Sequence, residues 1–193
     1  MTPTLRFPAE VLLAAQGCGP GIGLKAAIFD VDGVLTDGRV YVGESGEAFK
    51  AFSTLDGHGL KLLALGGITP IVVTGRDSPG VRHRMVELGV TQAVYGVDDK
   101  HAAAQATLAR LGLQWNEVAA MGDDWPDLPV LRASAFAAAP ANAHAEVCAA
   151  VHYVTRARGG FGAAREFCDL LLMAAGRYAG LVAGQSVRLD APR

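Results

Sequence analysis

Cysteine is scarce in this sequence, and its few thiols are scattered. Among 193 residues there are only three, Cys18, Cys148 and Cys168, which form neither a CxxC pair nor a metal-ligand spacing. An odd, scattered set of this kind is typical of a reducing compartment, where buried thiols behave as small apolar groups. We therefore expect a cytoplasmic protein.

An excess of charge of either sign is also missing. Seventeen basic and 19 acidic residues leave a formal net charge of −2, which gives no electrostatic footprint for nucleic acid or for an anionic membrane. No apolar run approaches the roughly 18 residues of a membrane span. A small, polar substrate is therefore expected in place of a polymer or a lipid surface.

Aromatic residues are few, at 7%, whereas hydrophobic residues make up 51% of the chain. The apolar residues are mostly Ala, Val and Leu, which suit the packing of helices on a sheet. The length predicts one domain with an ample core.

The two ends of the chain are expected to lie outside that domain. The apolar run from Val11 to Ala15 has only five residues, short of the roughly 7–15 of a secretion signal, and favours a short helix or a loose extension. Glycine and proline between residues 17 and 23 then separate it from the body. We predict an N-terminal extension at 1–22, a domain at 23–180 and a C-terminal tail at 181–193.

Short apolar runs alternate with amphipathic segments through the predicted domain. Strands apolar on both faces and separated by helices indicate a parallel sheet covered on each side, a doubly wound α/β fold. The predicted strands are 25–30, 70–74, 93–95, 117–121, 134–138 and 151–154. The predicted helices are near 57–66, 78–88, 99–111, 124–132, 143–149 and 162–175.

Residues 39–52 break this alternation. Apolar residues on either side of Gly43–Gly46 predict a β-hairpin that projects from the functional edge of the sheet. Because an isolated hairpin is marginal in water, we expect it to pack against something, such as another subunit.

Polar side chains follow the predicted strands where a parallel sheet binds its ligands. Asp30 and Asp32 come directly after the first strand, and two like charges so close call for a bound cation. The other polar residues that follow strands or begin helices are Thr74, Gly75, Arg76, Lys100, Asp123, Asp124 and Asp127. Taken singly, each could be a helix cap, but the whole set in this order indicates a phosphoryl-transfer site.

The chemistry of phosphoryl transfer assigns a role to each group. Asp30 would attack phosphorus to form an aspartyl-phosphate, and Asp32 would protonate the departing alkoxide and later activate water. Carboxylates of Asp30 and Asp123 with the backbone carbonyl of Asp32 suit Mg²⁺.

The remaining polar residues fill supporting roles. Thr74 and neighbouring amides would hold a phosphate oxygen, and Lys100 would balance charge on Asp30 and the phosphate. Asp124 is expected as an outer-shell metal partner, whereas the role of Asp127 stays open and could be no more than capping or orienting.

These motifs carry a family resemblance over residues 25–175. The pattern DxDGVLTDG from Asp30, followed by TGR, DK and GDDxxD, resembles the haloacid-dehalogenase-like phosphohydrolases. The residues within and around these motifs are similar to those of one branch, the 3-deoxy-D-manno-octulosonate 8-phosphate (KDO 8-phosphate) phosphatases. Residues that carry the finer likeness are 32–38, 56–61, 122–129, Thr155 and 158–166.

The resemblance implies magnesium-dependent hydrolysis of a sugar-acid phosphate in lipopolysaccharide precursor synthesis. It also implies a homotetramer, in which hairpins form a central barrel and C-terminal tails visit neighbouring sites. Spacing independently favours a branch without a cap domain. Residues 33–73 have room for one hairpin and one helix, and only 23 residues separate Arg76 from Lys100.

Substrate contacts are less specific in the sequence. Arg76 could bind the substrate carboxylate, although a helix cap is equally compatible. His58, in a glycine-flanked turn, and Arg158, beside a glycine loop, are further candidates.

Three competing functions are weighed against this interpretation. A receiver domain places its phosphoacceptor after a later strand, which disfavours it here. A nonulosonate phosphatase, for example for N-acylneuraminate 9-phosphate, stays open because motifs separate it poorly. A catalytically silent scaffold is disfavoured because every expected group is present.

Overall fold

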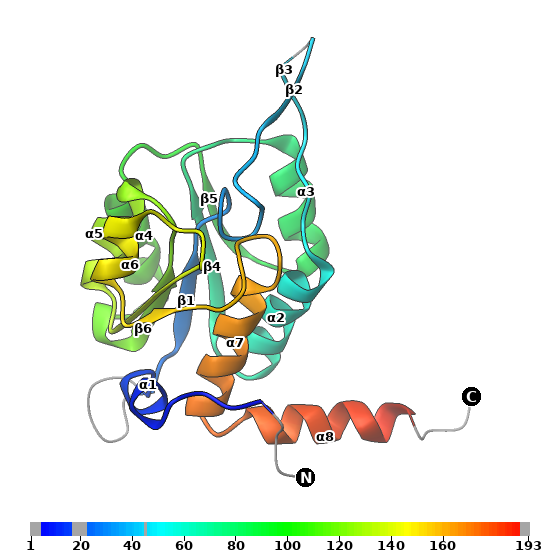
Figure 1. Cartoon of the computed structure of the whole chain (residues 1–193), viewed down its shortest axis with the longest axis vertical. Coiled ribbons are helices and arrows are strands. Elements are labelled where there is room, and N and C mark those ends of the chain that lie inside the picture. Colours follow the sequence, from blue (N-terminus) through cyan, green and yellow to red (C-terminus); the bar gives the residue numbers. More distant parts are fainter. Residues whose placement is uncertain (1–4, 17–22, 45, 190–193) are drawn as a thin grey trace.

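The centre of the protein is a six-stranded parallel sheet with strand order β5-β4-β1-β6-β7-β8 (Figure 1). The computed structural model describes residues 5–16, 23–44 and 46–189. The strands are β1 Ala26–Phe29, β4 Thr69–Thr74, β5 Gln92–Tyr95, β6 Val118–Met121, β7 Phe136–Ala139 and β8 Tyr153–Val154. All six predicted strands are confirmed, each with small shifts at its ends.

Helices cover both faces of this sheet because successive strand residues point to opposite sides. On one face, Phe29 packs in a core cluster with Leu63 of α2 (Thr54–Leu65) and Phe167 of α7 (Ala163–Ala174). On the other face, Ile28 packs in a second cluster with Leu108 of α4 (Lys100–Leu111). The doubly wound α/β prediction is therefore confirmed.

The helices divide between these two faces. The first cluster takes buried residues from α2 Thr54–Leu65, α3 Pro79–Leu88 and α7 Ala163–Ala174. The second takes them from α4 Lys100–Leu111, α5 Leu128–Ala133 and α6 Ala145–Ala150. Two short 3₁₀ helices, η1 Trp115–Glu117 and η2 Trp125–Asp127, flank β6.

A two-stranded hairpin projects from the carboxyl edge of the sheet, at the top of Figure 1. Its strands are β2 Tyr41–Gly43 and β3 Gly46–Phe49, shorter than the predicted span of 39–52. The register shifts between Tyr41 and Val42, which limits the ladder, while Tyr41 and Phe49 stack with ring centroids 4.5 Å apart. In the part of the chain that the structure describes, this hairpin is the sole insertion between β1 and α2, so the expectation of a capless fold is confirmed.

The start of α7 is fixed by a carboxylate from a distant helix. Asp56 of α2 is buried, and its side-chain oxygens accept hydrogen bonds from the Gly162 and Arg165 backbone amides at 3.1 and 2.8 Å. These amides belong to the unpaired group at a helix N-terminus. Asp56 therefore joins α2 to α7, which lie side by side on one face of the sheet.

The predicted terminal segments contain two further helices. Helix α1, Ala9–Ala14, precedes the buried Ala15, and Phe7 contacts Tyr153 edge to face at 6.0 Å. Helix α8, Tyr178–Leu189, runs across the boundary predicted at residue 180. Residues 17–22, which carry most of the predicted glycine-rich separator, lie outside the described residues. The division at 22 and 180 stays a prediction.

Among the described residues, no single helix is long and apolar enough to cross a membrane. The one pair that passes by length and composition is α7 with the start of α8, bent by 108° between them.

Candidate active site

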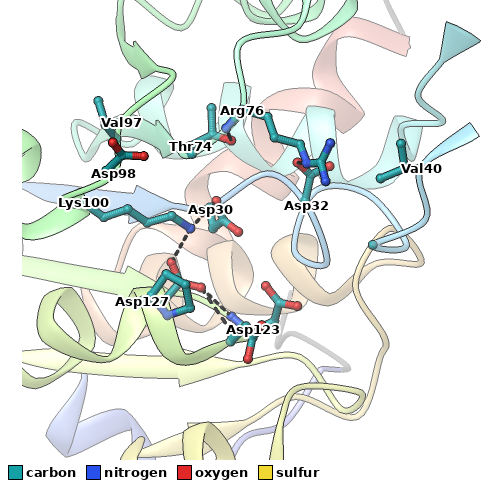
Figure 2. A pocket seen from close by; sticks show the side chains of 14 residues that line it. Asp30, Asp32, Val40, Thr74, Arg76, Val97, Asp98, Lys100, Asp123 and Asp127 are labelled. Atoms are coloured by element: carbon teal, nitrogen blue, oxygen red, sulfur yellow. Dashed lines mark hydrogen bonds and ion pairs between the residues drawn. The ribbon is translucent and has the colours of Figure 1, made fainter. Parts of the chain in front are cut away.

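A cavity of about 500 Å³ opens at the carboxyl ends of β1, β4 and β6. Figure 2 shows its acidic and basic side chains converging from loops that are far apart in sequence. The predicted residues that line it are Asp30, Asp32, Thr74, Gly75, Arg76, Lys100, Asp123 and Asp124. Asp127 lines it as well.

Asp30 is, with Asp127, one of the two buried acids of this cavity. It follows β1 and is buried, with its Oδ1 atom 2.8 Å from Lys100 Nζ. Burial, followed by the nearby charge of Asp127, raises the pKa of Asp30 to about 7, against the opposing effect of Lys100. Asp30 is thus a carboxyl held at a fixed position and facing the cavity.

Lys100 begins α4 and joins Asp30 to a second acid. Its Nζ atom lies 2.7 Å from Asp127 Oδ1, and the side chain is buried. Burial is the largest single effect and lowers the pKa of Lys100. The neighbouring charges of Asp30 and Asp127 together outweigh it, so the pKa of Lys100 is raised. The lysine is therefore charged at neutral pH and spans the acids of β1 and η2.

Asp127 organises the loop that follows β6. Its Oδ2 atom accepts hydrogen bonds from the backbone amides of Asp123 at 3.0 Å and Asp124 at 3.3 Å. The Asp124 side chain in turn accepts from the Trp125 amide at 2.8 Å and caps η2. The sequence left the role of Asp127 open, and the structure shows that it holds both the loop and Lys100.

The acids fit a hard divalent cation. Ligand atoms of Asp30, Asp123 and Asp127 all lie within 4.8 Å of one another. Burial, then the charges of Asp30 and Asp127, raise the pKa of Asp123 to about 8, so a bound cation would stabilise the charged form of this carboxyl. Because both Asp127 oxygens already accept hydrogen bonds, Asp30 and Asp123 are the carboxylates available to Mg²⁺. The Asp32 carbonyl and Asp124 stay predictions as metal partners.

Asp32 lies between two cations at the side of the cavity. Its Oδ1 atom bonds Lys50 Nζ, and its Oδ2 atom lies 3.7 Å from Arg76 Nε. Sequence reasoning missed Lys50, although a lone lysine between Phe49 and Ala51 in an otherwise apolar stretch could have drawn attention to it.

Thr74 ends β4 and is buried at the floor of the cavity. Its Oγ1 atom accepts a hydrogen bond from the Arg76 backbone amide at 3.4 Å, so the turn 74–76 is bent towards the site. A phosphate oxygen beside Thr74 and Gly75 would meet a hydroxyl and a backbone free of side-chain bulk. The structure brings this motif to the acids, as expected.

Two predicted substrate contacts are not brought to this cavity. His58 is exposed on α2 and lies near Asp169 of α7. Arg158 lines a separate cavity of about 330 Å³, together with Arg39 and Asn142. Neither lines the cavity of Asp30, because α2 and the 156–162 loop direct them elsewhere. Their contact with substrate stays a prediction without support from this geometry.

The fold and this constellation match known proteins. The family model described as haloacid dehalogenase-like hydrolase matches residues 96–164. The 3-deoxy-D-manno-octulosonate 8-phosphate phosphatase KdsC of Yersinia pestis is 41% identical over 157 residues, 81% of this chain and 84% of that protein.

Solved structures agree with this match. A probable YrbI family phosphatase from Pseudomonas syringae has a TM-score of 0.86 at 42% identity, covering 96% of this chain and 100% of that one. The 3-deoxy-D-manno-octulosonate 8-phosphate phosphatase from Moraxella catarrhalis, in complex with magnesium, phosphate and KDO, has a TM-score of 0.84 at 35% identity. The alignment covers 91% of this chain and 97% of that one.

The parallel sheet and the acids at its carboxyl edge, with the match of the family model, define a haloacid dehalogenase-like hydrolase. Within that class, the chain belongs to the family of 3-deoxy-D-manno-octulosonate 8-phosphate phosphatases.

Proposed function

We propose that this protein is a Mg²⁺-dependent phosphomonoesterase that hydrolyses KDO 8-phosphate to KDO and phosphate, a step in lipopolysaccharide precursor synthesis. The observation that carries the proposal is the pairing of Asp30 with Lys100 beside Asp123, in a cavity of about 500 Å³. Relatives about 40% identical over most of the chain bear the name of this activity.

The first half of the reaction uses both acids of the DxD pair. An oxygen of Asp30 attacks phosphorus, and the bond between phosphorus and the C8 oxygen of the sugar breaks. Asp32 gives its proton to that departing oxygen, so the sugar leaves as an alcohol and Asp30 carries the phosphoryl group. Lys100 holds Asp30 in place and balances negative charge beside it.

The second half returns the enzyme to its starting state. Asp32, now a carboxylate, takes a proton from water, and the water oxygen attacks phosphorus. The bond between phosphorus and Asp30 breaks, which releases inorganic phosphate and restores both carboxyl groups. Mg²⁺, when bound by Asp30 and Asp123, would neutralise phosphate oxygens during both transfers.

Other expectations are proposals of the same kind. Val42 and Phe49 expose their side chains on the projecting hairpin, which supports an assembly of copies, proposed as a homotetramer. In it, hairpins and C-terminal segments would complete neighbouring sites and contribute to the choice of sugar acid. The free thiols Cys148 and Cys168 accord with the proposed cytoplasmic location.

The test is the Mg²⁺-dependent release of phosphate from three substrates. We expect turnover of KDO 8-phosphate to exceed that of N-acylneuraminate 9-phosphate and of simple sugar phosphates. Asp30→Asn should abolish turnover while circular dichroism and the melting temperature remain close to wild type. A preference for the nonulosonate would reassign the substrate, whereas no activity on any phosphate would favour a silent scaffold.

A further inference from the structure

A lysine with a fully buried side chain, Lys50, contacts Asp32, the proposed proton donor. The Lys50 side chain is 0% exposed, and its Nζ atom bonds Asp32 Oδ1 and lies 3.2 Å from Glu47 Oε2. Lys50 directly follows β3, so it belongs to the base of the projecting hairpin. The hairpin therefore reaches into the site of its own chain.

Glu47 is itself held from the opposite side. Its Oε1 atom accepts a hydrogen bond of 2.6 Å from the hydroxyl of Ser78, the buried residue before α3. The Ser78 hydroxyl and then Lys50 lower the pKa of Glu47, so it is a carboxylate at neutral pH. A continuous row, Asp32–Lys50–Glu47–Ser78, thus links the loop after β1 to the hairpin and to the turn after β4.

The two cations beside Asp32 differ in how firmly they are held. The Arg76 side chain is 57% exposed and lies 3.7 Å from Asp32, beyond hydrogen-bond distance. Exposed ion pairs of this kind contribute little and leave long side chains mobile. The buried Lys50 has a fixed position, because a buried ammonium is tolerated only where anions surround it. Lys50 is therefore the group that fixes the orientation of Asp32.

We propose that Lys50 is a positioning residue for proton transfer: it holds the Asp32 carboxyl at the leaving oxygen of the substrate. The inference rests on the proposed function, because it takes Asp32 as the proton donor. Removing Lys50 leaves Asp32 with Arg76 alone, so its carboxyl rotates away from the line of transfer. Such a rotation misplaces the proton donor, which lowers the rate of proton transfer to the leaving oxygen by roughly 10- to 100-fold.

The leaving group provides a readout that a merely structural role would not move. Cleavage of 4-nitrobenzyl phosphate releases a basic alkoxide that needs a proton. Cleavage of 4-nitrophenyl phosphate releases an acidic phenol that does not. The two esters are close in size and shape. Their kcat/KM values report steps up to loss of the alcohol, and the ratio of the two values cancels any difference in the fraction of folded enzyme.

The variants are Lys50→Met and Lys50→Gln, with Asp32→Asn as the reference for loss of the proton donor. Lys25→Met is the matched control, because Lys25 forms an ion pair with Glu117 at the opposite end of β1. We expect both Lys50 variants to lower the benzyl-to-phenyl ratio of kcat/KM by about tenfold or more, and Asp32→Asn by about 10²-fold or more. Lys25→Met should leave the ratio unchanged.

A double variant tests whether Lys50 acts through Asp32. In the Asp32→Asn background, Lys50→Met should cause no further loss of the ratio. Equal losses of kcat/KM on both esters in the Lys50 variants would overturn the positioning role. A full further loss of the benzyl-to-phenyl ratio in the double variant would overturn it as well. The proposed function would stand in either case. An unchanged ratio in Asp32→Asn itself would overturn Asp32 as proton donor, and the inference with it.

Discussion

The Asp123 carboxylate lies directly over the backbone of Gly33. A Cβ atom on residue 33 would come within 2.0 Å of Asp123 Oδ2, and the backbone there has a φ of +90°. Real Cβ atoms do not approach oxygen so closely, and side chains disfavour this φ. The glycine of the DxDG motif therefore makes room for the acid that faces Asp30 across the candidate metal site.

Gly33→Ala should displace Asp123 and weaken magnesium binding together with turnover. Gly89→Ala is the matched control, because Gly89 has a φ of +73° but nothing within 4 Å of the added Cβ. Both substitutions should cost about 1–2 kcal/mol of backbone strain. We expect only Gly33→Ala to raise the magnesium concentration for half-maximal activity, measured by phosphate release. Normal magnesium dependence in Gly33→Ala would contradict this.

Asp56→Ala should destabilise the fold without acting on the chemistry directly. It removes the acceptor of the Gly162 and Arg165 amides at the start of α7. Because this junction is buried, we expect a loss of about 1–3 kcal/mol in the free energy of unfolding, measured by urea denaturation. Asp99→Ala, which removes an exposed cap from α4, should cost less. An equal or larger cost for Asp99→Ala would refute the buried-cap argument.

Val42→Asp should weaken the proposed assembly of copies. Val42 is 76% exposed on the hairpin, and burial of a charge in an interface is costly. Val86→Asp is the control, since Val86 is similarly exposed, at 80%, but belongs to α3 and not to the hairpin. Sedimentation velocity at micromolar concentration should show a smaller species for Val42→Asp alone. A wild-type monomer would refute the assembly itself.

The fold was predictable because its signals are local. Each sheet strand is a short apolar run, such as Ala26–Phe29, and the helices between them carry their own start and stop residues. The rule that ligands bind at the carboxyl ends of parallel strands then brought Asp30, Thr74 and Asp123 to one edge. The hairpin was overextended in the prediction, because a shift in register between Tyr41 and Val42 leaves no mark in the sequence.

The missed features all depend on where a side chain points after the chain has folded. Lys50 and Asp32 are 18 residues apart, and Asp56 and Arg165 are 109 apart. No periodicity reports such pairs. The same limit applied to His58 and Arg158, which lie near the right segments of sequence but face other surfaces. Motif spacing identified the reacting groups, whereas the residues that hold them required the structure.

Magnesium binding should be strongly coupled to pH. In the protein without metal, the pKa of Asp30 is raised to about 7 and that of Asp123 to about 8. At pH 6 both carboxyls therefore hold protons, which Mg²⁺ must displace because it binds carboxylates. We expect the affinity to rise between pH 6 and 9, by up to about tenfold per pH unit for each displaced proton.

Calorimetric titration in two buffers of different ionisation enthalpy counts the protons released. The buffer dependence should be large at pH 6.5 and vanish at pH 9, and Asp123→Asn should bind weakly at both. The pH dependence of folding stability provides an independent test of the raised pKa values. Because the folded state binds these protons more tightly than the unfolded state, whose pKa values lie near the ordinary 3.8, metal-free stability should fall as pH rises from about 4 to 8. Saturating Mg²⁺ should remove that fall, since the ion then compensates both carboxylates. A metal-free melting temperature that rises over this range would show that burial and the neighbouring acids do not raise the pKa values of Asp30 and Asp123 in the folded protein.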